Sequence, residues 1–209
     1  MMKLSIALLT SLVLLSGCGA FHAFQAWSAV SLGRQELFRG QNEGALESFE
    51  VAAREDPGYS FGVDRPQGVF SYLGRAEYLN GHYAQARQSL ERDLAWDPGN
   101  SLSRLYLGLT LARLNDRQNG LHNIVWGLTG IRYHINYYLK SDTDDIRRFW
   151  DHHNQIRDAI ASALKMAEPP NVDWDSLIVL SERIALAWEQ EPDLAWRYRE
   201  LMRPYNLKP

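Results

Sequence analysis

The stretch Gly58 to Gly62 contains a residue pattern that performs hydrolytic chemistry in other proteins. It reads GYSFG, which matches G-x-S-x-G and would make Ser60 a nucleophile. That arrangement requires a strand before the serine and a helix after it. Here the stretch follows an expected helix that is closed by Asp56-Pro57. We therefore expect a loop rather than a catalytic turn, and we keep a serine hydrolase using Ser60 as an alternative function.

Two further stretches contain residue types that can bind metal ions. His152 and His153 are adjacent, and neighbouring side chains on a helix point about 100° apart, so they cannot hold one ion together. His153 falls between Trp150 and Ile156 on an expected apolar face, which predicts a packing role. The segment DTDD, residues 142–145, lacks the glycine and the distal glutamate of a calcium loop. We interpret it as a helix cap and predict no metal site and no catalytic residue.

Cys18 is the only cysteine in the 209 residues and it ends an apolar run. The run from Leu4 to Leu15 follows a short start with one lysine, and it is shorter than the roughly 20 residues that a spanning helix needs. These features are typical of a signal peptide. The order Leu-Ser-Gly-Cys resembles the lipobox of bacterial lipoproteins. The resemblance implies that residues 1–17 are removed, that Cys18 is lipidated, and that Gly19 after it directs the protein to the outer membrane.

An acylated Cys18 excludes several classes of chemistry. No thiol would remain for a disulfide, a thiolate metal ligand or cysteine catalysis. The formal net charge is −3, and no run of basic residues indicates nucleic acid as a partner. We expect a protein of the bacterial envelope that faces the periplasm, is held on the membrane by its lipid, and has no cofactor besides that covalent lipid on Cys18.

A repeated pattern of glycine, small and large residues organises residues 26–131. Leu-Gly recurs three times, and each glycine is followed by a small residue after twelve positions and by a large apolar residue after sixteen. A glycine on one helix lets a second helix approach closely, so the pattern predicts antiparallel helix pairs. The second and third glycines are 34 residues apart, and the first two are 41 apart, which indicates a seven-residue insertion. The three sets are Gly33, Ala45 and Phe49; Gly74, Ala86 and Leu90; and Gly108, Gly120 and Ile124.

This spacing resembles the tetratricopeptide repeat family. Pro57 and Pro98 close the first two units, each after an aspartate, whereas the third unit lacks the proline. The resemblance implies an all-α fold: an α-solenoid of about three helical hairpins over residues 26–131. A C-terminal helical extension over residues 132–209 is then expected to cover the open end of the solenoid. Residues 18–25 would form a short lipidated tether.

The resemblance also implies a groove that binds peptides and is lined by the first helix of each unit. Such a groove would be apolar with three arginines, which suits an amphipathic helix or an extended peptide with one or two carboxylates. Its residues would be Trp27, Arg34 and Phe38 from the first unit, Ser71, Arg75 and Tyr78 from the second, and Leu102, Leu105, Leu109 and Arg113 from the third.

The extension after the repeats is rich in aromatic residues. Its apolar periodicity predicts a helix over residues 146–164, a second from Trp174 to Trp188 that Asn171 or Asp173 can cap, and a short last helix around Leu194 to Leu201. We predict a non-enzymatic scaffold or adaptor, anchored to the membrane, that recruits or assembles envelope proteins. The alternatives are the serine hydrolase and binding of a glycan or small molecule by the aromatic-rich helices after Gly130.

Overall fold

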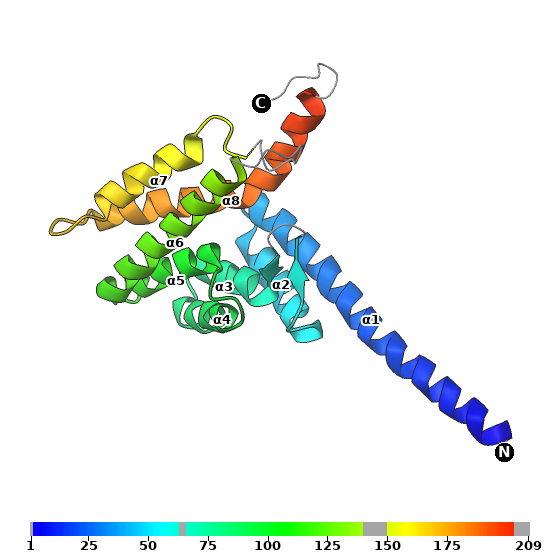
Figure 1. Cartoon of the computed structure of the whole chain (residues 1–209). Helices are drawn as coiled ribbons and strands as arrows, with labels where there is room; N and C mark the ends of the chain where they lie inside the picture. Colours follow the sequence, from blue (N-terminus) through cyan, green and yellow to red (C-terminus); the bar gives the residue numbers. More distant parts are fainter. Residues whose placement is uncertain (1, 63–65, 140–149, 203–209) are drawn as a thin grey trace. The chain divides into compact units, whose positions relative to one another are not determined.

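The computed structural model describes residues 2–62, 66–139 and 150–202, and it describes side chains over residues 19–62, 66–137 and 150–201. Within these ranges the chain forms eight helices and a single pair of two-residue strands (Figure 1). The predicted all-α fold class is therefore confirmed. The side chain of Cys18 and the predicted cap at residues 142–145 lie outside the described residues.

The chain divides into two compact units, Met1–Asp93 and Leu94–Pro209. In unit 1 the antiparallel strands pair Ser60 with Gly68 and Phe61 with Gln67. They occupy the region where the longer first repeat predicted an insertion. The elements that begin in unit 1 are α1 (Met2–Phe38), α2 (Asn42–Glu55), β1 (Ser60–Phe61), β2 (Gln67–Gly68), α3 (Val69–Leu79) and α4 (Tyr83–Trp96).

Unit 1 contains two helical hairpins that meet at glycines. A Cβ atom on Gly33 of α1 would lie 2.7 Å from the ring of Phe49 on α2, and a Cβ on Gly74 of α3 would lie 2.6 Å from Cγ of Leu90 on α4. The two hairpins share one core, because the ring of Tyr72 stacks on Phe49 with 5.2 Å between centroids. That core consists of Val30, Leu37, Ala45, Phe49, Ala52, Val69, Tyr72, Leu73 and Ala76.

Unit 2 begins with a third hairpin that shows the same relationship. A Cβ on Gly108 would lie 2.5 Å from the backbone nitrogen of Ile124 and 2.8 Å from the carbonyl oxygen of Gly120. Asn100 caps the first helix of this hairpin by accepting a hydrogen bond from the backbone N–H of Ser103 at 3.2 Å. The helices of unit 2 are α5 (Ser101–Arg113), α6 (Arg117–Leu139), α7 (Gln155–Met166) and α8 (Trp174–Met202).

Helices α7 and α8 lie side by side at the C-terminal end of the described chain (Figure 1). Asp173 caps α8, as predicted, because its carboxylate accepts a hydrogen bond from the N–H of Ser176 at 3.2 Å. The prediction of a separate last helix was wrong, since α8 continues through Pro192. A proline inside a helix removes one backbone hydrogen bond, and Trp188 and Ala195 on either side of it are buried.

The N-terminal helix α1 is longer than the sequence pattern predicted. Its backbone is helical without interruption from Met2 to Phe38, so the expected tether at residues 18–25 is part of the same helix as the first repeat. At a rise of about 1.5 Å per residue, these eight residues extend about 12 Å along the axis. In the part of the chain that the structure describes, no helix is both long and apolar enough to cross a membrane.

Candidate functional site

Six of the ten residues predicted to line a peptide groove lie in the protein interior. A peptide could reach these side chains only after the chain opens, so in this structure they act as core residues rather than as the lining of an open groove. Their role in peptide binding stays a prediction. The six are Ser71, Arg75, Tyr78, Leu102, Leu105 and Leu109.

The four remaining groove residues keep exposed surface; they are Trp27, Arg34, Phe38 and Arg113. Both arginines contact other side chains of their own unit. In unit 1 the guanidinium carbon of Arg34 lies 5.4 Å from the ring centroid of Phe38 and 4.9 Å from that of Phe61. In unit 2, Nη2 of Arg113 donates a 3.2 Å hydrogen bond to Oε1 of Glu182 on α8. Trp27 is the fourth of these residues and is exposed.

A cavity of about 380 Å³ lies between α8, the start of α7 and the turn that precedes α7. Its size falls within the usual range of small-molecule sites. Apolar, polar and aromatic side chains from both helices and from the turn line it. The apolar lining residues are Ile156, Ala159, Leu180, Ile184, Ala187 and Leu194, and the others are Asp151, His152, His153, Gln155, Arg183, Gln190, Glu191 and Tyr198.

The two adjacent histidines lie in a turn, not in the helix that the periodicity predicted. Asp151 and Asn154 adopt positive φ angles of 49° and 61°, so the backbone reverses before α7 begins. His152 and His153 are exposed, and their rings lie 6.0 and 5.9 Å from the ring of Tyr198 on α8. The predicted packing role for His153 is therefore replaced by a place at the cavity rim. Among the described residues no group of three or more acidic, histidine or cysteine side chains could hold a metal ion.

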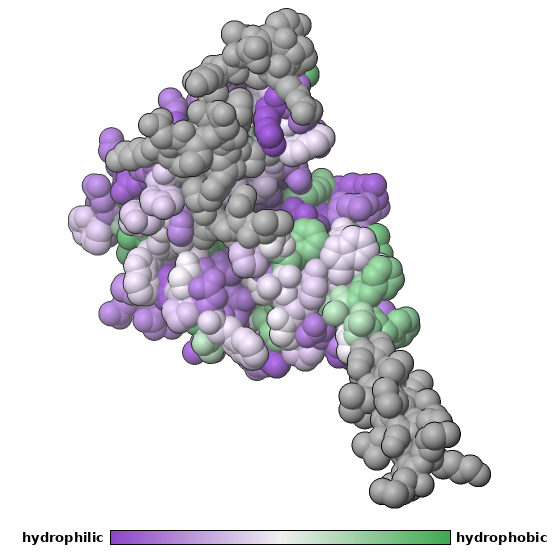
Figure 2. All heavy atoms as spheres, turned by 45° about the vertical axis from the view of Figure 1, so that its right-hand side comes forward, coloured by the Kyte–Doolittle hydropathy of each residue, from purple (hydrophilic) through white to green (hydrophobic). Residues whose placement is uncertain are grey.

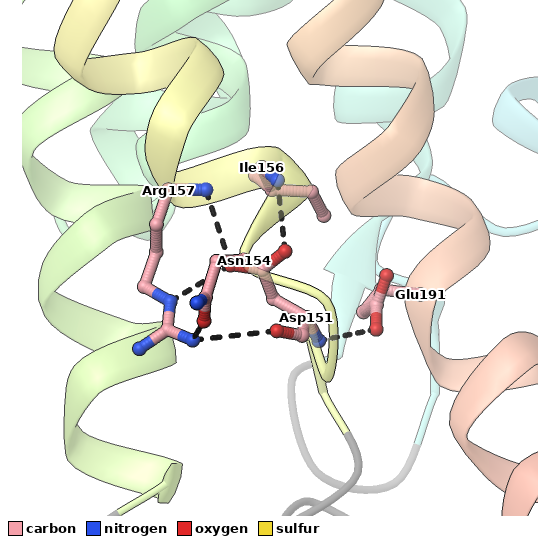
Figure 3. Close-up of polar contacts among 5 residues, drawn as sticks. All are labelled: Asp151, Asn154, Ile156, Arg157 and Glu191. Carbon is pink, nitrogen blue, oxygen red and sulfur yellow. Dashed lines mark hydrogen bonds and ion pairs between the residues drawn. The ribbon is translucent and has the colours of Figure 1, made fainter.

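The carboxylate of Asp151 holds this turn against the first turn of α7 (Figure 3). One oxygen accepts the backbone N–H of Ile156 at 2.8 Å, and the other accepts the backbone N–H of Arg157 at 3.1 Å and its Nε at 2.8 Å. The same guanidinium also donates to the side chain of Asn154. Because the side chain of Asp151 is only 1% exposed, its charge is balanced inside the protein by Arg157 and the helix N-terminus.

Glu191 of α8, which also lines the cavity, holds the same turn through the backbone of Asp151. Its Oε1 accepts the backbone N–H of Asp151 (Figure 3). Burial raises the pKa of Glu191; the hydrogen bond from the Asp151 backbone opposes this increase, and the negative charge of Asp151 adds to it. The cavity wall is thus built from residues that are far apart in sequence and are joined by buried hydrogen bonds.

Arg183 gives the cavity rim a positive charge. It lies on α8 among the lining residues and is exposed to solvent. It forms no ion pair within the part of the chain that the structure describes. Asp151 is already paired with Arg157, so Arg183 is the cation that a bound carboxylate would meet. Apolar lining residues beside one such cation suit a ligand with an apolar body and an acidic group.

Ser60, the alternative catalytic residue, lacks the geometry of a nucleophile turn. It is exposed in β1, which pairs with β2, and the next helix begins only at Val69. The strand, serine and helix that the pattern requires do not follow one another here.

Comparisons with protein-family models, curated proteins and solved structures find no match for this chain.

Proposed function

We propose that this chain is a non-enzymatic scaffold or adaptor of the bacterial envelope, held on the outer membrane by a lipid on Cys18 and facing the periplasm. The observation that supports its binding role best is the cavity between α7 and α8. The partner is an envelope protein or peptide that inserts an apolar side chain into the cavity and places a carboxylate near Arg183.

The hairpins support the proposed relationship to tetratricopeptide repeats. In all three hairpins the glycine of the first helix contacts the large residue sixteen positions later. This agreement concerns backbone packing inside each hairpin, which is the physical basis of the sequence pattern. Proteins of that repeat type commonly bind other proteins, and this chain is proposed to do the same through its C-terminal helices.

Exposed aromatic residues on α1 support attachment to a membrane. Phe21, Phe24 and Trp27 are exposed, and the rings of Phe24 and Trp27 lie 5.6 Å apart. Figure 2 shows apolar residues gathered where the described side chains of α1 begin. In a helix Phe24 lies about 9 Å along the axis from Cys18, so a lipid on Cys18 would bring these rings to the membrane interface, where aromatic side chains are favoured.

Chemical crosslinking in membranes followed by affinity purification tests the adaptor function. Wild-type chain is compared with Arg183→Glu, and the matched control is Arg197→Glu, an exposed arginine on the same helix that does not line the cavity. We expect one set of envelope proteins to purify with the wild type and the control and to be lost with Arg183→Glu. If all three chains purify the same proteins, the cavity is not the binding site; if none purifies any, the adaptor function is wrong.

A small ligand is a second candidate occupant of the cavity, favoured by the closeness of His152, His153 and Tyr198. A ligand that binds only the folded chain stabilises it by RT ln(1 + [L]/Kd), so the melting temperature rises with ligand concentration. Decanoate, which combines an apolar chain with a carboxylate, should raise the melting temperature of the wild type and have less effect on Arg183→Glu. Decanol serves as the uncharged control, and an equal effect of both compounds on both chains would exclude a specific site.

A further inference from the structure

Helix α6 has a buried aliphatic face and an exposed face that is rich in aromatic residues. The buried face faces the other helices of unit 2 and consists of Ile124, Leu128, Ile131 and Ile135. The opposite face bears residues spaced by three or four positions, so that they lie in one row along the helix. We call this row the α6 aromatic face; it consists of His122, Trp126, Thr129, Tyr133 and Tyr137.

The α6 aromatic face is long and open to solvent. From His122 to Tyr137 it extends about 22 Å at the usual helical rise. Trp126 is 55% exposed, Tyr133 is 65% exposed and Tyr137 is 61% exposed. Large aromatic side chains exposed together in one row indicate a surface that contacts something else.

The charge of this helix differs from that of the whole protein. The chain has a formal net charge of −3, whereas Arg117–Leu139 contains two arginines and no aspartate or glutamate. A further arginine, Arg104 of α5, places its guanidinium carbon 4.1 Å from the ring centroid of Trp126. Arg117 lies over the ring of Trp174 on α8, 5.5 Å from its centroid, so Arg104 and Arg132 are the cations beside the α6 aromatic face. With no carboxylate on α6, this charge is complementary to an anionic surface.

The ring contacts help to choose between two possible partners of this face, a sugar chain and the headgroup layer of a bilayer. A sugar chain binds by stacking on a free flat face of an aromatic ring. Here Arg104 covers one face of Trp126, and Tyr133 and Tyr137 stack on each other with 6.5 Å between centroids and 19° between ring planes. These contacts leave less free ring surface for a sugar, whereas the headgroup layer of a bilayer favours tryptophan and tyrosine through their apolar rings and polar atoms.

We propose that the α6 aromatic face is a membrane-contact surface that binds the headgroup region of a bilayer containing anionic lipids. Trp126, Tyr133 and Tyr137 enter the interface, while Arg104 and Arg132 attract the lipid charges. This surface differs from the cavity between α7 and α8, and it requires no ligand there. It gives the protein a contact with lipid that is separate from Cys18.

A fluorescent label on the α6 aromatic face tests the proposal. The full-length chain with Cys18→Ser has no other cysteine, so Thr129→Cys, between Trp126 and Tyr133, can be labelled with an environment-sensitive NBD dye. Ser162→Cys, exposed on α7, is the control position. Both proteins are mixed with vesicles of phosphatidylcholine alone or with added phosphatidylglycerol.

The proposal predicts a blue shift and increased emission at position 129 with the anionic vesicles, and no change at position 162. Replacing Arg104 or Arg132 by glutamine should weaken this binding about five-fold each, since that is the usual contribution of one basic residue near an anionic membrane. An unchanged spectrum at position 129 would overturn the proposal. Equal shifts at both positions would also overturn it, as would a shift with purified peptidoglycan but not with vesicles.

Discussion

Glu191 on α8 accepts the backbone N–H of Asp151, a residue forty positions earlier in the chain. This hydrogen bond joins the turn before α7 to the second half of α8. Because the Asp151 side chain also caps α7, the two acidic residues together determine where one wall of the cavity lies. The stability of unit 2 and the shape of the candidate site therefore depend on the same buried contacts.

Replacing Glu191 separates the effect of its hydrogen bond from that of its charge. Glu191→Ala leaves the N–H of Asp151 without its acceptor and should destabilise the protein by about 1–3 kcal/mol. Glu191→Gln keeps an acceptor oxygen and removes a group whose charged form is disfavoured by burial, so it should be at least as stable as the wild type. Urea unfolding monitored by tryptophan fluorescence measures both differences. Equal loss of stability in the two variants would show that the acceptor oxygen is unimportant.

The raised pKa of Glu77 on α3 predicts that the stability of the protein depends on pH. It is 9% exposed, and burial raises its pKa to about 7; a hydrogen bond from Ser89 opposes the increase and the charge of Glu50 adds to it. Below the ordinary value of 4.5 the residue is protonated in both the folded and unfolded chain. As the pH rises from there to about 7, the unfolded chain loses its proton first, so stability falls by up to about 3 kcal/mol and stays lower above pH 7.

Glu77→Gln tests this assignment because it removes the charge and keeps the shape. Unfolding should then show the variant to be more stable than the wild type above pH 7 and similar to it below pH 4.5. Glu50→Gln, an exposed change that removes only a repulsion, should have a smaller effect. A difference between Glu77→Gln and the wild type that does not change with pH would contradict the prediction.

The glycines of the hairpins predict a large effect from a small substitution. In Gly108→Ala the new Cβ would lie 2.5 Å from the backbone nitrogen of Ile124, and a backbone atom cannot move aside as a side chain can. We expect destabilisation of about 1–3 kcal/mol, despite the higher helix propensity of alanine. Gly19→Ala is the control, because no atom lies within 4 Å of the added group. Similar melting temperatures for the two variants would disprove the close approach.

The sequence predicted the helical hairpins because close helix packing requires small residues at fixed positions. Gly33, Gly74 and Gly108 therefore indicate the contact partners directly, and the structure has those partners in place. The cap of α8 at Asp173 was predictable for a similar reason, since a cap is a local interaction.

The candidate site was not predictable, since it depends on contacts between distant residues. Two positive φ angles, at Asp151 and Asn154, convert an expected helical stretch into a turn, and the apolar periodicity gave no sign of this change. The exposed or buried state of Leu102, Leu105 and Leu109 likewise depends on long-range packing and not on their spacing. The sequence did contain one sign of the cavity, an apolar series on one face of α8. The series consists of Leu180, Ile184, Ala187 and Leu194.

Photo-crosslinking from the cavity tests the adaptor account most directly. A photoreactive phenylalanine analogue replaces Gln155, which lines the cavity, or Ala161, an exposed residue of the same helix that does not. After irradiation of intact cells, the account predicts a protein adduct at position 155 and none at position 161. Adducts at neither position, or equal adducts at both, would contradict the claim that this chain binds an envelope partner between α7 and α8.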